Sequence, residues 1–302
     1  MTTIGFIGLG IMGGPMAANL VKAGFDVIGY NRSRDKVDAL IGVGGQGADD
    51  VGGAVRDADI IITMVPDSAD VEAVTTGDDG IFANAKEGAL YIDMSSIRPD
   101  VSARVAELGR QRGLRVLDAP VSGGEVGAVE ASLSIMVGGD AADFEAAKPV
   151  LEAVGKTIVH VGPAGAGQTV KAANQLIVAG NIELVAEAIT FLEAYGVDME
   201  AALEVLGGGL AGSTVMARKG AGMLAGEFNP GFRLQLHHKD LGIVQSAARE
   251  AGVVIPLGAV VSQLVAAMVA RGDGGLDHSG LLKLVRELSG RSADSQNSTR
   301  PT

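Results

Sequence analysis

The sequence contains no cysteine and no tryptophan. Without cysteine the chain can form neither a disulfide framework nor a reactive thiolate. Its four histidines are scattered along the chain, so a zinc site built from cysteine and histidine is hard to assemble. We therefore expect a protein that binds no metal and that has no redox chemistry of its own.

Basic residues are also in short supply. The 24 lysines and arginines stand against 36 acidic residues, a net charge of −12. A negative field of this size repels nucleic-acid phosphates and anionic membrane surfaces. The first residues also lack the basic region and apolar stretch of a secretory signal. We expect a cytoplasmic protein that acts on small molecules, without nucleic-acid or membrane partners.

Apolar residues are abundant, at 47% of 302 residues, which is enough to build two domains. In the first half, short β-rich runs alternate with helical patterns. The runs cover residues 4–7, 27–30, 60–65, 90–94, 116–119, 134–138 and 157–161. Strands separated by helices predict an α/β fold with a doubly wound, mostly parallel sheet of the Rossmann type. We assign residues 1–162 to this domain.

After residue 162 no comparable strand run appears, and helical periodicity dominates. Residues 164–195 contain no internal proline and predict one long apolar helix. Its apolar stretch around residues 176–192 is interrupted by polar side chains, those of Asn174, Asn181, Glu183 and Glu187. Because hydrocarbon would penalise them, we expect a buried helix that joins the first domain to an all-α domain at residues 163–290. Residues 291–302 are polar and predict a flexible tail.

A Gly-x-Gly-x-x-Gly motif follows the first predicted strand. Its residues are Gly8, Leu9, Gly10, Ile11, Met12 and Gly13. Such glycines permit a tight turn, a close approach of the backbone to a pyrophosphate, and close packing of a helix on the strand. In a chain with 45 glycines a chance match is an alternative. The position between a predicted strand and an apolar-periodic helix favours dinucleotide binding.

An acidic residue is missing where NAD sites usually have one. The second predicted strand is followed by Asn31, Arg32 and Ser33, whereas an NAD site places Asp or Glu there to hold the ribose 2′-hydroxyl. Asn31 and Ser33 can hydrogen-bond a 2′-phosphate, and Arg32 can pair with its charge. NADP, with NADPH preferred over NADH, is therefore the expected cofactor. The alternative is that Arg32 and Arg34 merely lie on a solvated helix start. The absence of an acidic residue favours NADP whether or not these arginines bind the cofactor.

A serine and two glycines follow another predicted strand, in the segment Asp118-Ala119-Pro120-Val121-Ser122-Gly123-Gly124. The carboxyl ends of strands form the binding crevice of a wound sheet, and a hydroxyl beside two glycines suits a carboxylate. The same residues also make an ordinary turn. Spacing alone does not decide between the two.

The start of the long helix carries a second polar group of residues. Gly167, Lys171 and Asn174 are spaced to share one helical face. Lys171 is the only ionisable side chain between Pro163 and Ile182. A lysine that extends from an apolar helix into solvent is the commoner reason for such a residue, whereas a polar stripe on a domain-joining helix indicates the wall of a cleft.

Together these segments resemble the β-hydroxyacid dehydrogenase family from about residue 4 to residue 288. The family includes 3-hydroxyisobutyrate dehydrogenases, glyoxylate/succinic semialdehyde reductases and tartronate semialdehyde reductases. The resemblance is carried by the glycine motif, by residues 118–124, by Gly167 with Lys171 and Asn174, and by Lys239-Asp240-Leu241.

Residues 64–68, 92–97, 207–214 and 277–279 look most like the tartronate semialdehyde reductase branch. Bacterial members of that branch often have an acid after the second strand. The Asn31-Arg32 pair departs from that pattern toward the NADP-using glyoxylate reductases, which leaves the cofactor and the substrate open.

The resemblance implies a reductase of tartronate semialdehyde (2-hydroxy-3-oxopropionate) to glycerate, with Lys171 as general acid and base. Ser122, Gly123, Gly124 and Asn174 would hold the substrate. Val65, Pro66 and Ser96 would flank the nicotinamide, and Lys239 would reach the cofactor. A solvated surface charge is a nearly equal alternative for Lys239. No metal is required, and a homo-oligomer, dimer or tetramer, is expected.

Two other functions remain open at this point. The same chemistry would serve a 3-hydroxyisobutyrate dehydrogenase or a glyoxylate/succinic semialdehyde reductase, because discrimination of one methyl group is worth only about 1–3 kcal/mol. The chain could instead be a noncatalytic NADP-binding interaction module, against which Lys171, Asn174 and the Ser122 loop argue. His237, His238 and His278 have no assigned task.

Overall fold

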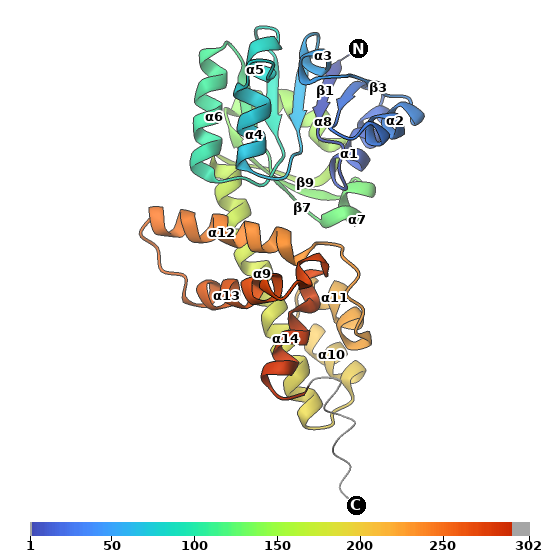
Figure 1. Cartoon of the computed structure of the whole chain (residues 1–302), viewed down its shortest axis with the longest axis vertical. Coiled ribbons are helices and arrows are strands. Elements are labelled where there is room, and N and C mark those ends of the chain that lie inside the picture. The colour runs from blue at the N-terminus through green and yellow to red at the C-terminus, as the bar shows by residue number, and fades with distance from the viewer. Residues whose placement is uncertain (1, 292–302) are drawn as a thin grey trace, which may run out of the picture. The chain divides into compact units, whose positions relative to one another are not determined.

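The computed structural model describes residues 2–291 (Figure 1). The chain divides after Lys171 into two compact units. This division falls inside the long helix α9 (Ala166–Ala194), so the domain ranges 1–162 and 163–290 stay predictions. Apart from Arg291, the predicted tail at residues 291–302 lies outside the described residues.

The first unit contains one sheet with the strand order β3-β2-β1-β4-β5-β6-β8-β7, and β9 pairs with β8. The strands are β1 (Thr3–Ile7), β2 (Asp26–Tyr30), β3 (Gln46–Gly47), β4 (Ile60–Thr63), β5 (Leu90–Asp93), β6 (Arg115–Asp118), β7 (Val121–Ser122), β8 (Leu133–Gly139) and β9 (Gly155–Gly162). Neighbours from β3 to β6 are parallel, β8 is antiparallel to β6 and β7, and β9 is parallel to β8. All seven predicted strands are confirmed.

Helices cover both faces of this sheet. They are α1 (Gly13–Lys22), α2 (Arg34–Gly42), α3 (Val51–Val55), α4 (Ser68–Thr76), α5 (Ile81–Asn84), α6 (Pro99–Gln111), α7 (Gly124–Val129) and α8 (Ala141–Glu152). Side chains of α1, α2 and α8 pack on one face, and those of α3 to α6 pack on the other. The doubly wound Rossmann-type sheet is confirmed.

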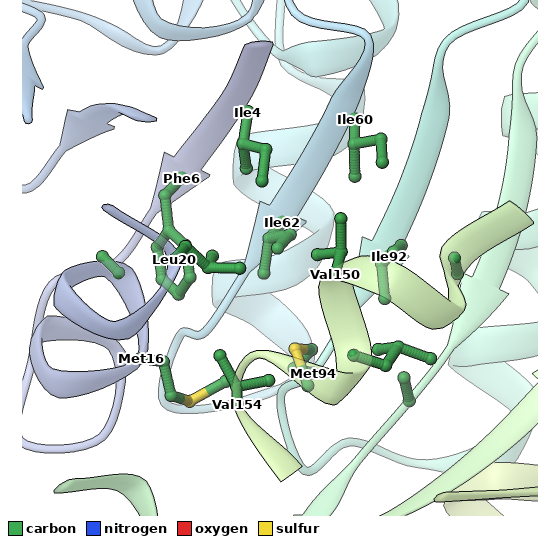
Figure 2. Packing of buried hydrophobic residues seen from close by; sticks show 14 of the residues in the cluster. Ile4, Phe6, Met16, Leu20, Ile60, Ile62, Ile92, Met94, Val150 and Val154 are labelled. Carbon is green, nitrogen blue, oxygen red and sulfur yellow. The ribbon is translucent and has the colours of Figure 1, made fainter. Parts of the chain in front are cut away.

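The run of isoleucines in β4 shows why its sequence is continuously apolar. Ile60 and Ile62 belong to the core on one face, and Ile61 belongs to the core on the other, because successive side chains of a strand point to opposite faces. Figure 2 shows Ile60 and Ile62 near Val150 of α8, in the cluster that also includes Phe6 of β1. The one polar side chain of this strand, that of Thr63 at its end, is hydrogen-bonded to Asp93.

The second unit is helical, as predicted. It contains the part of α9 that follows Lys171, and then α10 (Met199–Gly207), α11 (Thr214–Ala225), α12 (Leu234–Glu250), α13 (Pro256–Ala270), the short 3₁₀ helices η1 (Asp273–Gly275) and η2 (His278–Gly280), and α14 (Leu281–Leu288). Ala179 and Ile182 of α9 pack against α12, α13 and α14. Ala186 and Ile189 pack against α11 and α14.

By length and composition alone, α9 is apolar enough to cross a membrane. One such helix is weak evidence, because the core helix of a folded domain has the same composition. Ala179, Ile182, Ala186 and Ile189 are fully buried in the helical core. This packing favours a core helix that is buried along one side.

Candidate active site

The glycine motif forms the turn between β1 and α1. Gly8 has a φ of +98°, and a Cβ added there would lie 2.3 Å from the carbonyl oxygen of Met64. A Cβ on Gly13 would lie 1.9 Å from the carbonyl oxygen of Gly8. A Cβ on Gly10 would meet nothing within 4 Å. The first and third glycines are thus required by the packing of the chain, and the second leaves open space at the start of α1, which fits the pyrophosphate of a dinucleotide.

Asn31 links the end of β2 to this turn. Its Oδ1 atom accepts a hydrogen bond of 3.0 Å from the amide of Leu9, and its Nδ2 atom donates to the carbonyl oxygen of Ser33 at 3.3 Å. Sequence reasoning assigned Asn31 to a 2′-phosphate and missed this contact with the glycine turn. The side chain of Asn31 therefore helps to shape the turn itself.

The two arginines after β2 lie in different surroundings. The side chain of Arg32 is 80% exposed, and its Nη1 atom is 3.9 Å from Asp70. Arg34 forms ion pairs of 3.0 Å with Asp38 and 2.8 Å with Asp49. Arg34 thus has the surroundings of a solvated helix start, whereas Arg32 has one long ion pair and is accessible to an anion.

A buried carboxylate supports the loops after β4 and β5. Oδ1 of Asp93 accepts hydrogen bonds from the hydroxyl of Thr63 at 2.7 Å and from the amide of Ser95 at 3.1 Å. The hydroxyl of Ser95 in turn accepts from the amide of Val65 at 3.0 Å. Burial raises the pKa of Asp93 to about 6. Asp93 and Ser95 hold the segments that carry Val65, Pro66 and Ser96, the residues predicted to flank the nicotinamide.

Asp118, at the end of β6, fixes the start of α9. Its Oδ1 atom accepts from the amide of Gly165 at 2.7 Å, and its Oδ2 atom accepts from the amide of Gln168 at 2.9 Å. Burial raises the pKa of Asp118, and these amide hydrogen bonds oppose that rise. The amides at a helix N-terminus have no partner within the helix, so the carboxylate both satisfies them and holds the turn that precedes Lys171.

Gln168 connects the same helical turn to the loop after β5. Its Oε1 atom accepts from the amide of Ile97 at 3.1 Å, and its Nε2 atom donates to the carbonyl oxygen of Ser95 at 2.8 Å. Sequence reasoning missed Gln168. The sequence feature that could have identified it is a polar side chain in a mostly apolar helix, three residues before the predicted proton-transfer residue.

Gly167 is required for a reason other than its spacing from Lys171. A Cβ on Gly167 would lie 2.4 Å from the carbonyl oxygen of Met136 and 2.7 Å from Oδ2 of Asp118. The glycine thus lets α9 approach β8 and the carboxylate. Lys171, one turn further along, is buried with 8% of its surface exposed. This burial does not fit the alternative of a lysine that extends into solvent.

Ser122 ends β7, Gly123 forms the loop after it, and Gly124 begins α7. Gly123 and Gly124 have φ values of +144° and +65°, which residues with side chains rarely adopt. The loop leads directly into α7, and the side-chain amide of Asn19 in α1 donates to the carbonyl oxygen of Ala128 at 2.8 Å. The segment from Ser122 to Gly124 therefore leads into a helix that is tied to α1, the helix that begins at the glycine motif.

In the second unit, Asn174 and Lys239 belong to one hydrogen-bonded chain. The side-chain nitrogen of Asn174 donates to Oε1 of Gln175 at 2.7 Å, and Nε2 of Gln175 donates to Oδ2 of Asp240 at 2.6 Å. Oδ1 of Asp240 is 3.0 Å from the amine of Lys239, whose side chain is 20% exposed. A low exposure and an ion pair do not match a solvated surface lysine. Gln175, which joins the two predicted residues, was missed.

Within residues 2–291, no group of three or more histidine or acidic side chains could hold a metal ion. The predicted site residues carry hydrogen-bond donors and acceptors and three basic side chains, those of Arg32 and Lys171 in the first unit and that of Lys239 in the second. Such a set suits proton transfer and the binding of anions.

Comparisons with known proteins agree with this chemistry. Residues 3–162 match the family described as the NAD binding domain of 6-phosphogluconate dehydrogenase. Residues 165–285 match the family described as NAD-binding of NADP-dependent 3-hydroxyisobutyrate dehydrogenase. Together the two families cover most of the chain.

Individual relatives match over nearly their whole length. The chain is 43% identical to a 2-hydroxy-3-oxopropionate reductase of Escherichia coli, with 95% of this chain and 98% of the relative covered. It is 39% identical to a 3-hydroxyisobutyrate dehydrogenase of Pseudomonas aeruginosa, with coverages of 95% and 99%. A solved structure of the 3-hydroxyisobutyrate dehydrogenase of Mycobacterium tuberculosis with L-serine is 35% identical, with a TM-score of 0.87 and coverages of 95% and 99%. The chain therefore belongs to the β-hydroxyacid dehydrogenase family and is an NAD(P)-dependent oxidoreductase.

Proposed function

We propose that the enzyme reduces tartronate semialdehyde to glycerate, prefers NADPH to NADH, and uses Lys171 as its general acid and base. The observation that carries the proposal is the burial of Lys171, one turn after the helix start that Asp118 holds. The 43% identity to a 2-hydroxy-3-oxopropionate reductase supports the choice of substrate.

In this proposal the residues of the chain bind the substrate and move one proton. The bound cofactor supplies a hydride to the carbonyl carbon. Ser122, Gly123 and Gly124 bind the carboxylate of the aldehyde, and Asn174 adds a hydrogen bond. Lys171 donates a proton to the carbonyl oxygen as negative charge develops there, and it accepts that proton in the oxidation direction. Its positive charge also attracts an anionic substrate to an otherwise acidic protein.

The cofactor would be held mainly by backbone groups. In the turn from Gly8 through Leu9, Gly10, Ile11 and Met12 to Gly13, the open space at Gly10 would admit the pyrophosphate and the amides at the start of α1 would bind it, because the amides of Gly8 and Leu9 already donate to Tyr30 and Asn31. Arg32 and Ser33 would bind the 2′-phosphate, with Asn31 nearby. An exposed ion pair as long as 3.9 Å contributes little, so Arg32 loses little when it leaves Asp70 for a phosphate. Val65, Pro66, Ser96 and Lys239 would complete the cofactor contacts.

We also propose a cytoplasmic homo-oligomer with no nucleic-acid or membrane partner. Ile177, Leu184 and Phe191 of α9 are 62%, 52% and 62% exposed. Their spacing of seven residues places them along one side of the helix. A row of exposed apolar side chains supports association through this side, and sedimentation velocity would measure the oligomeric state.

A panel of aldehydes tests the substrate. Initial rates of NADPH and NADH oxidation would be measured with tartronate semialdehyde, glyoxylate, succinic semialdehyde and methylmalonate semialdehyde. We expect the highest kcat/KM for tartronate semialdehyde with NADPH. The 39% identity to a 3-hydroxyisobutyrate dehydrogenase favours methylmalonate semialdehyde as the second candidate. NADPH binding without turnover of any of the four would indicate a noncatalytic module.

A further inference from the structure

Two buried histidines of the helical unit contact each other beside the chain of residues that joins Asn174 to Lys239. His237 of α12 is 0% exposed and His278 of η2 is 6% exposed. Their Nδ1 atoms lie 3.1 Å apart. The ring of Phe232 packs edge-on against both imidazoles, with centroid distances of 5.7 and 5.4 Å. The pair is thus enclosed, and the proposed proton transfer does not use it.

The contacts of His237 determine where each ring carries its hydrogen. Nε2 of His237 lies 3.3 Å from the backbone carbonyl oxygen of Gln175. A carbonyl oxygen can only accept, so His237 carries a hydrogen on Nε2. A neutral imidazole has a hydrogen on one ring nitrogen only, so in the neutral ring Nδ1 of His237 is an acceptor. His278 must then carry its hydrogen on Nδ1 and donate it to His237.

Burial keeps the ring of His278 neutral at pH 7.5, although its Nε2 atom lies 3.9 Å from Oδ1 of Asp277. Burial, together with the neighbouring His237 and Lys219, lowers the pKa of His278 to about 3, although Asp277 opposes this shift. Asp277 itself accepts hydrogen bonds from the hydroxyl of Ser279 at 2.7 Å and from the amine of Lys219 at 2.8 Å. Asp277 thereby anchors the turn that presents His278 to His237.

The histidine pair leads directly to the predicted site residues. His237 donates to the backbone of Gln175, and the side chain of Gln175 contacts both Asn174 and Asp240. Asp240 pairs with Lys239. A change in the tautomer of either histidine would place two hydrogens, or none, between the Nδ1 atoms, and would push the ring of His237 away from Gln175.

We propose that His278 and His237 are positioning residues for the reaction. The hydrogen bond from Nδ1 of His278 to Nδ1 of His237 holds His237 in the tautomer that binds Gln175, and Gln175 then orients the amide of Asn174 and the carboxylate of Asp240. This inference rests on the proposed role of Asn174 in substrate binding.

The first test reads the tautomers directly and needs no substrate. Long-range ¹H–¹⁵N correlation spectra of the ¹⁵N-histidine-labelled enzyme at pH 7.5 distinguish the two tautomers. With only four histidines in the chain, the spectra of His278→Asn and His237→Gln assign the two signals. We expect His278 to be protonated on Nδ1 and His237 on Nε2. The reverse assignment, or a doubly protonated ring, would overturn the proposal whether or not any aldehyde is reduced.

The second test measures the kinetic consequence. His278→Leu removes the donor, and we expect KM for the aldehyde to rise about fivefold to tenfold, as for the loss of one hydrogen bond, with kcat changing less. The side-chain nitrogen of Asn can take the place of Nδ1, so His278→Asn should restore KM to within about twofold of the wild-type value. His238→Leu, an exposed neighbour on the same helix, is the matched control and should leave KM unchanged.

Equal KM values for His278→Leu and the wild type would overturn the positioning role. So would a His278→Asn variant that is as impaired as His278→Leu while melting at the wild-type temperature. If the wild-type enzyme reduces none of the aldehydes, the proposed function fails, and the tautomer spectra still decide the structure of the pair.

Discussion

Oδ2 of Asp118 accepts a hydrogen bond of 2.9 Å from the amide of Gln168, at the first turn of α9. Because the side chain of Gln168 also binds Ser95 and the amide of Ile97, one carboxylate fixes both the helix start and the loop after β5. Lys171 is three residues further along the same helix. The position of the proposed proton donor therefore depends on Asp118.

Replacing Asp118 with Asn should lower activity. The amide group of Asn would turn an N–H toward one of the two backbone amides that Asp118 now binds, at Gly165 or Gln168. We expect kcat to fall about tenfold and the free energy of unfolding to fall by about 1–3 kcal/mol, measured by steady-state kinetics and urea unfolding. Asp143→Asn, at a partly buried ion pair with Arg115, is the control. An Asp118→Asn enzyme with wild-type kcat would refute this role.

The choice of cofactor is predicted to depend on Arg32. Arg32→Ala should lower kcat/KM for NADPH about tenfold or more, because a charged hydrogen bond to phosphate is lost, and it should leave kcat/KM for NADH nearly unchanged. Arg34→Ala is the matched control, since Arg34 already pairs with Asp38 and Asp49. Equal losses with both cofactors would show that Arg32 does not recognise the 2′-phosphate.

Two helical glycines should respond oppositely to alanine. The added Cβ of Gly167→Ala would lie 2.4 Å from the backbone oxygen of Met136. We therefore expect the free energy of unfolding to fall by about 2–3 kcal/mol. A Cβ on Gly242 of α12 would meet nothing within 4 Å, so Gly242→Ala should stabilise the protein by about 0.5–1 kcal/mol. Thermal unfolding should give a melting temperature below that of the wild type for Gly167→Ala and above it for Gly242→Ala. Equal melting temperatures of the two variants would be inconsistent with the packing at Gly167.

The buried Glu183 should make stability depend on pH. Burial, with a smaller effect from Glu187, raises the pKa of Glu183 from 4.5 to about 7. Between these values the folded state holds a proton that the unfolded chain has released, so stability falls as pH rises through this window. We therefore expect the free energy of unfolding of Glu183→Gln, relative to that of the wild type, to rise by roughly 3 kcal/mol between pH 4.5 and pH 8.

Urea unfolding at the two pH values measures this gain. Glu204→Gln, at an exposed position of α10, should show no such difference from the wild type. A pH-independent difference between Glu183→Gln and the wild type would mean that Glu183 does not hold its proton in the folded state.

The fold was predictable because its signals are local. Each of the seven predicted strands is an apolar run, and the long helix lacks proline. The strands β3 and β7 escaped prediction because two residues are too few to form a pattern. The strand predicted at 60–65 ends at Thr63, and the carbonyl group of the next residue, Met64, lies close to Gly8.

The supporting residues of the site were not predictable because their partners are distant in sequence. Gln168 binds residues more than 70 positions away, and His237 and His278 are 41 positions apart. Asn31 was assigned to the cofactor from its place after β2, but only the fold reveals its bond to Leu9. Local pattern identifies the residues that carry charge, whereas tertiary contacts determine which residues hold them in place.

The central claim is that Lys171 transfers the proton. The most direct test is kcat/KM of Lys171→Ala for the NADPH-dependent reduction of tartronate semialdehyde, with the Kd of NADPH measured by fluorescence titration on the same protein. We predict a loss of about 10²- to 10⁴-fold in kcat/KM with the Kd of NADPH within about twofold of the wild-type value. A Lys171→Ala enzyme that retains the wild-type kcat/KM would contradict the account.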